Sequence, residues 1–440
     1  MTTHTLADGD TDMETTHWGG PGEDYRLSKI SAAAISEDNG IGAPAPDDAA
    51  PVWQPPKAIH SFPWFEMVMT VIGVLGIIGL TLYMLTPEAT GYFALVKTTL
   101  LALIPLVIVV GFLIRIDRWE PEPWKTKISV FLWGAGVATL SAGILNTALH
   151  HNIAYSTGDA QGASALSATF VAPLVEETLK GVVVLIVVLV RRTSINSVLD
   201  GVVYAGFSAA GFMFTEDILY FLRGEAEGTT NLIVLVVMRG IFSPFLHVMA
   251  TSMTGIGLAL ALLKFKRGWS KAGIVAVFWV CAMGIHFLWN GSASYGGGWF
   301  LILYAVVQVP AFIVWSVLLL RATRKEAEKI RTGLVPYVRT GWVLPGEVTM
   351  ATDKRSRKAA LKWAARGGRD AKKAMRSFLA NLASLGLDQR LMAKHGPDPA
   401  RIENDRQMLT DNRREFLRLT SIAEQQHDVS KAVSSRARAA

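Results

Sequence analysis

The sequence contains almost no cysteine. Of its 440 residues only Cys281 is one, and it lies in an apolar run. A single chain can therefore form neither an internal disulfide nor a cysteine-based metal site. The first 60 residues also lack the apolar core of a cleavable signal peptide. We therefore expect the first hydrophobic run, which begins after Pro63, to act as the insertion signal.

Charge is scarce in the middle of the chain and opposite in sign at its two ends. Residues 1–62 contain 10 Asp and Glu against 3 Lys and Arg, whereas residues 321–440 contain 13 Asp and Glu against 26 Lys and Arg. Residues 63–320 are almost neutral. The sequence therefore predicts three parts: a disordered acidic tail, a membrane domain and a basic helical tail.

The central region consists of apolar runs of about 20 residues, the length at which a helix crosses a hydrocarbon core of about 30 Å. We expect an all-α polytopic bundle of about eight spans, near residues 65–86, 92–116, 127–149, 167–190, 198–222, 230–263, 271–292 and 298–320. The sixth run is too long for one straight span, and Gly240 and Pro244 predict a kink or a break in it. Lys and Arg gather in the loops after the second, fourth and sixth runs, which predicts that both termini are cytoplasmic.

Three ionisable residues lie together in the fourth run. Each such group costs about 2.5–3.5 kcal/mol at the centre of a bilayer. Glu176 and Lys180 are four residues apart and share a helix face, and Glu177 lies beside them. Pro173, one turn earlier, could open the helix above the carboxylates. A chain that keeps three such groups close together is expected to use them.

The next three runs add polar residues at a similar depth. These are Glu216 in the fifth run, His247 and Thr251 in the sixth, and His286 and Asn290 in the seventh. Counting about 1.5 Å per residue from the ends of the spans places the four groups Glu177, Glu216, His247 and His286 in one slab, between the midplane and the extracytoplasmic side. Antiparallel neighbouring helices could bring these groups together.

Two imidazoles with several carboxylates are the donor set of a divalent metal ion, and imidazole favours Zn²⁺. A carboxylate that does not bind the metal could deprotonate a bound water. Asn290 could hold an oxyanion or orient a ligand, and Lys180 could pair with a carboxylate. These are the components of peptide hydrolysis.

The alternative to a protease is a proton-coupled membrane transporter, which would also place carboxylates and histidines at mid-membrane. A signalling scaffold acting through the basic tail is a third possibility.

Four motifs resemble, in their order and spacing, those of the PrsW family of intramembrane proteases, a family related to the CAAX prenyl endopeptidases and to bacteriocin-processing membrane proteases. The motifs are Glu176-Glu177-Thr-Leu-Lys180, Phe212-Met-Phe-Thr-Glu216, His247 with Thr251, and His286-Phe-Leu-Trp-Asn290. The resemblance covers about residues 65–320.

The resemblance implies a multi-pass metalloendopeptidase, which we expect in a bacterial plasma membrane. It implies as substrate a membrane-anchored protein of the anti-sigma factor kind. It also implies a role for each motif residue. The Glu176 and Glu177 pair would supply the base and a further ligand. Glu216, His247 and His286 would bind the metal, and Asn290 would hold an oxyanion or support the site.

The C-terminal region is rich in basic residues and prone to form helices. Met375, Phe378, Leu379 and Leu382 follow helical spacing beside Lys and Arg. This pattern predicts an amphipathic helix that lies on anionic lipid or on a cytoplasmic partner. Nucleic-acid binding is not expected, because the basic residues are not interleaved with aromatic ones and the tail is attached to a membrane domain.

Other polar and small residues of the spans are expected to be structural. Asp200 and Asp217 lie near the ends of spans and are expected to be solvated, whereas Arg239 is expected to snorkel or to form a structural ion pair. Residues 116–124, with two prolines, predict an interfacial loop. Close helix contacts are expected at Gly206, Gly211, Gly255 and Gly257.

Overall fold

The computed structural model describes residues 64–85, 91–416 and 418–419, and within these ranges it contains helices and no β-strand. The predicted acidic tail of residues 1–62 lies outside the described residues. The chain divides into two compact units, with the division between Thr323 and Arg324. The unit Ser61–Thr323 holds the apolar helices and is called the membrane unit here.

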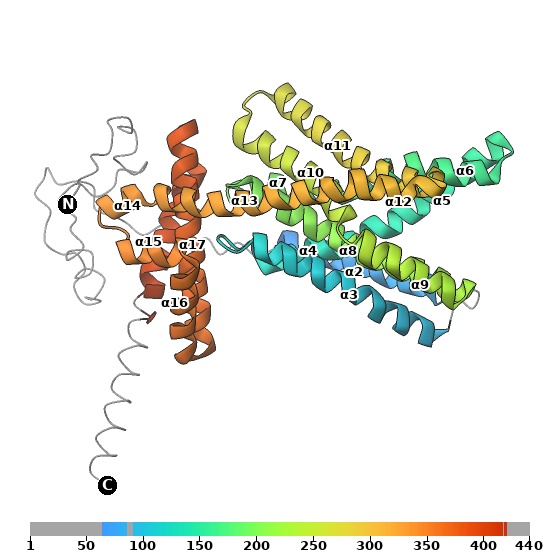
Figure 1. The fold of residues 1–440 in the computed structure, drawn as a ribbon. Helices are drawn as coiled ribbons and strands as arrows, with labels where there is room; N and C mark the ends of the chain where they lie inside the picture. The colour runs from blue at the N-terminus through green and yellow to red at the C-terminus, as the bar shows by residue number, and fades with distance from the viewer. Residues whose placement is uncertain (1–63, 86–90, 417, 420–440) are drawn as a thin grey trace, which may run out of the picture. The chain divides into compact units, whose positions relative to one another are not determined.

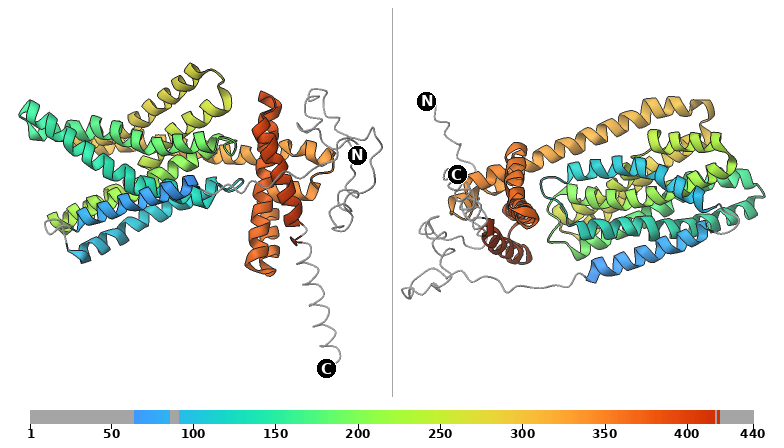
Figure 2. Two further views of the ribbon diagram at one scale, coloured as in Figure 1. Left: turned by 180° about the vertical axis from the view of Figure 1, so that it is seen from behind. Right: turned by 90° about the horizontal axis from the view of Figure 1, so that it is seen from below.

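The membrane unit is a bundle of long helices that run side by side, as Figure 1 and Figure 2 show. Its helices are α2 (Trp64–Met84), α3 (Tyr92–Ile116), α4 (Trp124–Leu132), η2 (Trp133–Ala138), α5 (Thr139–Thr157), α6 (Ala160–Leu166), η3 (Ser167–Val171), α7 (Ala172–Val190), α8 (Val198–Glu227), α9 (Thr229–Val237), η4 (Met238–Phe242), α10 (Leu246–Lys264), α11 (Gly268–Tyr295), η5 (Gly297–Trp299), α12 (Phe300–Leu303), η6 (Tyr304–Gln308) and the first part of α13 (Val309–Gly333).

Seven helices among the described residues are long and apolar enough to cross a membrane. They correspond to all the predicted spans except the fourth. The fourth predicted span is the continuous helical stretch of η3 and α7, which has the length but carries Glu176, Glu177 and Lys180. The prediction of an all-α polytopic bundle is therefore confirmed, and the polar fourth span is the one that hydropathy alone does not support.

The break predicted in the sixth span is present. The helix ends at Phe242 and begins again at Leu246, with a turn over residues 243–245. Pro244 has no N–H with which to continue the helical hydrogen bonds. The Phe242 carbonyl accepts a hydrogen bond of 3.1 Å from the Tyr304 hydroxyl. This bond satisfies a backbone group that the break releases, as an apolar environment requires.

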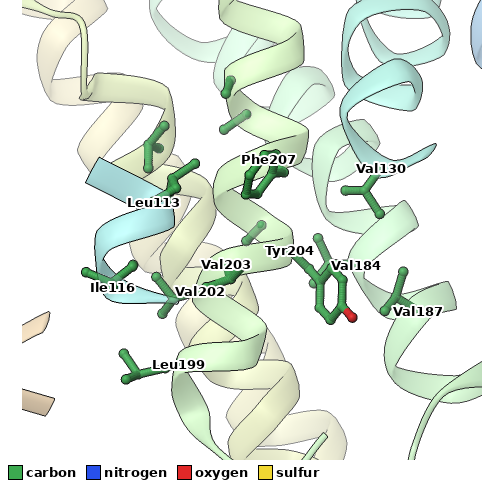
Figure 3. Packing of buried hydrophobic residues seen from close by; sticks show 14 of the residues in the cluster. Leu113, Ile116, Val130, Val184, Val187, Leu199, Val202, Val203, Tyr204 and Phe207 are labelled. Carbon is green, nitrogen blue, oxygen red and sulfur yellow. The ribbon is translucent and has the colours of Figure 1, made fainter. Parts of the chain in front are cut away.

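Helix α8 lies at the centre of the bundle and is buried over most of its length. In Figure 3, Val202 of α8 lies on the side of Leu113 from α3, whereas Tyr204 lies on the side of Val184 and Val187 from α7. The core of the membrane unit is therefore built around α8. The last turns of this helix carry Glu216 and Asp217.

Glycines allow the closest contacts between these helices, as the sequence predicts. A Cβ atom at Gly255 would overlap the carbonyl oxygen of Gly201, and one at Gly211 would overlap the carbonyl oxygen of Phe131. Any side chain at these positions would push α8 away from α10 and α4. The other two predicted positions, Gly206 and Gly257, lie against the side chains of Leu113 and Phe278.

The second unit is a separate group of helices with a core of its own. It contains the last part of α13, α14 (Val335–Arg339), α15 (Pro345–Thr352), α16 (Lys354–Arg366), α17 (Gly368–His395) and a helix over residues 399–416. Its core includes the predicted apolar face of α17, whose members Met375, Phe378, Leu379 and Leu382 are at most 4% exposed. That face is covered within the protein and is not available to lipid, contrary to the prediction. Contact of the exposed basic residues with anionic lipid or a partner stays a prediction.

Candidate metal centre

Helices α7, α8, α10 and α11 carry the predicted site residues and pack against one another. The chain enters α7 through the π-helical turn η3, and Pro173 lies in the first turn of α7. A π turn inserts one extra residue and is common at functional sites. The helix is thus widened just before Pro173, where the sequence predicts an opening. The following turn presents Glu176 and Glu177 to the neighbouring helices.

Glu177 is fully buried, and three side chains hold it. Its Oε1 lies 2.6 Å from Lys180 Nζ and 2.9 Å from His286 Nδ1. Its Oε2 accepts a hydrogen bond of 2.7 Å from the Thr251 hydroxyl. Both carboxylate oxygens are therefore occupied by protein groups. Glu177 fixes the ring of His286 and the ammonium group of Lys180.

Glu176 has one carboxylate oxygen without a hydrogen-bond partner among the described residues. Its Oε1 accepts a hydrogen bond of 3.2 Å from Asn146 Nδ2. Its Oε2 is buried, forms no hydrogen bond with any described residue, and lies 3.8 Å from His286 Nε2 and 3.9 Å from Lys180 Nζ. A buried acceptor left unpaired costs about 1–3 kcal/mol, and more when it is charged. This oxygen is a position where a cation would be favourable.

His247 and His286 lie next to this free oxygen. Their rings are 4.9 Å apart between centroids and nearly perpendicular, at 88°. One donor atom from each of Glu176, His247 and His286 lies within 4.8 Å of the other two, and all three residues are buried. Two imidazoles and one carboxylate form a common ligand set of catalytic zinc, which leaves a further position for water or substrate.

Glu216 lies on the other side of His247. Its Oε2 is 2.8 Å from His247 Nε2 and 2.6 Å from Arg239 Nη2. Arg239 also donates through Nε to Asp217 Oδ1, at 2.5 Å. The prediction that Arg239 forms a structural pair is confirmed. The prediction that Asp217 is solvated is wrong, because Asp217 is fully buried between α8 and η4.

Asp200 is also buried, which corrects the prediction that it is solvated. It accepts hydrogen bonds from the backbone N–H groups of Asn196 and Ser197, and Ser197 also donates through its hydroxyl. These bonds form a capping box at the start of α8. Asp200 therefore satisfies the first backbone donors of the helix instead of facing solvent.

The charges of this cluster do not balance. Among the described residues it joins four carboxylates, those of Glu176, Glu177, Glu216 and Asp217, to two cationic side chains, those of Lys180 and Arg239. With neutral imidazoles, four negative and two positive charges leave a formal charge of −2. Unbalanced charge inside an apolar bundle is costly, and one divalent cation would neutralise it. The residues present therefore fit a divalent metal ion.

A cavity of about 420 Å³ adjoins the cluster and is called the catalytic cavity here. Its walls include Glu176, Glu216, Arg239, His247, His286 and Asn290. It extends to His150 and Ser164, on either side of the turn between α5 and α6. A polar space of this size holds water and accommodates part of a ligand.

Two asparagines join the cluster to neighbouring helices. Asn290 donates a hydrogen bond of 2.8 Å to the carbonyl of Ala168 in η3, and it lines the catalytic cavity. Asn146, which donates to Glu176, is a site residue that the sequence motifs did not indicate. Thr139, two helical turns before it, lines the same cavity. A polar stripe along the third predicted span is the signal that would have identified Asn146.

These features define an integral membrane protein with a buried carboxylate and histidine centre that faces a polar cavity. Residues 122–315, which contain every predicted site residue, match the PrsW family of intramembrane metalloproteases. Protease PrsW of Clostridioides difficile (strain 630) is 29% identical over 173 residues, which make up 39% of this chain and 68% of that protein. No solved structure matches the chain. The membrane unit is thus similar to the PrsW family over residues 122–315, and these matches support a membrane metalloprotease.

Proposed function

We propose that this protein is an endopeptidase that cleaves a membrane-associated protein in the catalytic cavity, near the extracytoplasmic face. The observation that best supports the proposal is the convergence of Glu176, His247 and His286 at one wall of a polar cavity. The family match favours hydrolysis over proton-coupled transport.

In this proposal Glu176, His247 and His286 hold a divalent cation, and their donor set favours Zn²⁺. The cation, when bound, supplies Lewis-acid polarisation of the peptide carbonyl and activation of water. Glu177 orients His286 through Nδ1, as outer carboxylates commonly do for metal-binding histidines. The family resemblance makes Glu216 a ligand instead. We assign the ligand role to Glu176 because its free oxygen lies beside His286 and because Arg239 already pairs with Glu216.

Glu216 is the remaining carboxylate at the wall of the catalytic cavity, and we assign it the proton from the attacking water. Arg239 fixes its position at 2.6 Å. Asn290 lines the same cavity and has a second amide hydrogen to donate as negative charge develops on the carbonyl oxygen. Glu177 is less suited to accept this proton, because Lys180, His286 and Thr251 enclose it.

The proposed orientation places both termini in the cytoplasm of a bacterial cell, since Lys and Arg gather in alternate loops. The turn between α5 and α6 and the end of α8 are then extracytoplasmic. His150, Ser164 and Arg223 line the catalytic cavity near these ends, so water and substrate would enter from the outer face.

An anti-sigma factor is the substrate that the family resemblance implies, and its identity stays a prediction. Contact of the basic second unit with anionic lipid or a cytoplasmic partner is part of the same proposal.

The test compares membrane proteins in cells that express the wild type, Glu176→Gln or Glu225→Gln. Glu225 lies on α8 like Glu216 but pairs with Lys97, so Glu225→Gln is a control for removing a carboxylate from the bundle. We expect an intact substrate to accumulate with Glu176→Gln and not with Glu225→Gln. Full cleavage by Glu176→Gln would contradict the proposal.

Metal content separates the roles of the two carboxylates. We expect purified Glu176→Gln to lose its stoichiometric metal and Glu216→Gln to keep the metal while losing cleavage. The opposite pattern would restore Glu216 as the ligand. Wild-type protein that contains no divalent metal and is insensitive to chelators would refute the metal assignment as a whole.

A further inference from the structure

A second cavity, of about 190 Å³, lies where the sixth span is broken, and it is called the break pocket here. The turn over residues 243–245 forms one side of it. Phe242, Phe245, Met249, Trp289, Tyr304 and Phe312 contribute aromatic and aliphatic walls. Among the described residues that line the break pocket, none is charged. Its chemistry is therefore opposite to that of the catalytic cavity.

The break pocket shares two walls with the catalytic cavity. Leu246 and Trp289 line both spaces. In the sequence Leu246 directly precedes His247, and Trp289 directly precedes Asn290. A peptide whose reacting carbonyl lies beside His247 therefore has the break pocket within reach of a neighbouring side chain.

The walls of the break pocket are held in place before any ligand arrives. Tyr304 stacks on Phe242 with ring centroids 4.9 Å apart, and its hydroxyl donates to the Phe242 carbonyl. Phe245 and Phe312 lie 5.1 Å apart between centroids. A preformed pocket binds without first paying to order its walls, and its fixed shape discriminates between side chains of different size.

We propose that the break pocket is a specificity subsite of the protease, which binds one large apolar side chain next to the scissile bond of the substrate. This inference rests on the proposed function. A cavity of about 150 Å³ lined by Leu, Ile and Phe is enough to bind benzene, so the break pocket has room for a side chain of the size of Leu, Met or Phe. A charged side chain would lose its hydration there without gaining a partner.

The experiment uses the purified full chain with its metal and a series of peptide hydroxamates as probes, because a hydroxamate binds a catalytic metal directly. The probes share one peptide scaffold and differ only in one side group: methyl, isobutyl, benzyl or aminobutyl. We expect affinity to rise about 10- to 100-fold from methyl to benzyl, as burial of a large apolar group predicts. We expect no such gain for aminobutyl.

Val309→Phe fills the break pocket, since Val309 lines it. Its matched control is Val306→Phe, the same substitution three residues earlier at a position that is 67% exposed. We expect Val309→Phe to remove the gain from the benzyl group and Val306→Phe to keep it. The methyl probe should bind all three proteins equally, because neither valine lines the catalytic cavity. If Val309→Phe does not fold, Phe312→Ala replaces it and should shift the preference toward a larger naphthylmethyl group.

Four outcomes would overturn the inference, and they differ from one another. Benzyl preference that survives Val309→Phe places the side group elsewhere. Co-purified lipid that decreases with Val309→Phe, with no change in probe preference, makes the break pocket a lipid site. If the methyl probe binds but affinity is independent of the side group, only the subsite is refuted. If no hydroxamate binds the wild type at all, the metal centre and the proposed function fail together with the subsite.

Discussion

The membrane unit buries two clusters of charged side chains, and only one of them resembles an active site. The catalytic cluster consists of Glu176, Glu177, Lys180, Glu216, His247 and His286. The loop cluster consists of Asp117, Glu122, Lys127, Asp200 and Tyr204. Each cluster pairs a buried lysine with a carboxylate at 2.6 Å, Lys180 with Glu177 in one and Lys127 with Asp117 in the other.

The loop cluster attaches the predicted interfacial loop to the core. The Tyr204 hydroxyl of α8 donates to the carboxylate of Glu122, and the Glu122 N–H donates to Asp117. Burial raises the pKa of Asp117 to about 6. Burial and the carboxylates of Asp200 and Asp117 raise the pKa of Glu122 well above its usual range. Both shifts favour the neutral form of the carboxyl group, which reduces the cost of burying these side chains.

The comparison shows that buried charge alone does not indicate catalysis. The loop cluster contains oxygen and ammonium groups and no imidazole, and its bonds connect one loop to the helix beside it. The catalytic cluster contains two imidazoles, joins four helices and lines a cavity of about 420 Å³. The type of donor and access to water distinguish a reactive site from a structural one.

The largest expected effect separates the two clusters by activity. His286→Ala removes a proposed ligand, and we expect peptide cleavage to fall about 10³-fold or more, since a catalytic metal supplies several kcal/mol of transition-state stabilisation. Tyr204→Phe, in the loop cluster, should leave metal content and cleavage unchanged. The measurements are initial rates and metal analysis of purified protein. Comparable losses in both variants would remove the distinction between the clusters.

The second effect is on stability. Lys127→Met removes the cation that lowers the pKa of buried Asp117, so Asp117 takes up a proton and loses its hydrogen-bond partner, and we expect a loss of about 1–3 kcal/mol in the free energy of unfolding. The double variant Asp117→Asn with Lys127→Met should recover most of this loss, because it removes both charges. Unfolding in detergent followed by circular dichroism measures both. Metal affinity should stay at the wild-type value in the double variant, and a large change in it would link the loop cluster to the site.

The third effect tests whether Glu177 positions His286. Glu177→Gln keeps the shape of the side chain but weakens its bonds to His286 and Lys180, and we expect metal affinity or activity to fall about 10- to 100-fold. Titration of the apoprotein with Zn²⁺ gives the affinity. The loss should be smaller than that of His286→Ala. If the variant binds metal normally and is inactive, Glu177 takes part in the chemistry.

The smallest effect compares two asparagines, one beside each cluster. Asn146 donates to Glu176, and Asn196 donates to Glu120 of the predicted interfacial loop. We expect Asn146→Ala to cost about 0.6 kcal/mol of stability, the mean for side-chain hydrogen bonds between membrane helices, and Asn196→Ala, which removes a hydrogen bond between two loops, to cost about 1 kcal/mol. Metal affinity should decrease in Asn146→Ala alone. Equal metal affinities would show that Asn146 has no influence on the proposed ligand.

The sequence determined the helical bundle, the break in the sixth span and the common depth of the polar residues. These features depend on local rules: the length of an apolar run, the missing N–H of Pro244, and a rise of about 1.5 Å per residue. They hold whichever way the helices are packed. The order of the motifs also indicated the family.

Only the tertiary structure distinguished Glu176 from Glu177. Both side chains reach His286, at 3.8 Å for Glu176 and 2.9 Å for Glu177, but only Glu176 keeps an oxygen that forms no hydrogen bond with the described residues. The rotation of α7 after the π turn and the positions of Lys180 and Thr251 decide which one it is. The burial of Asp217 and of the apolar face of α17 follows in the same way from the other helices that pack against them. Hydropathy and spacing describe one helix at a time, whereas the partners of a buried group are set by how several helices pack.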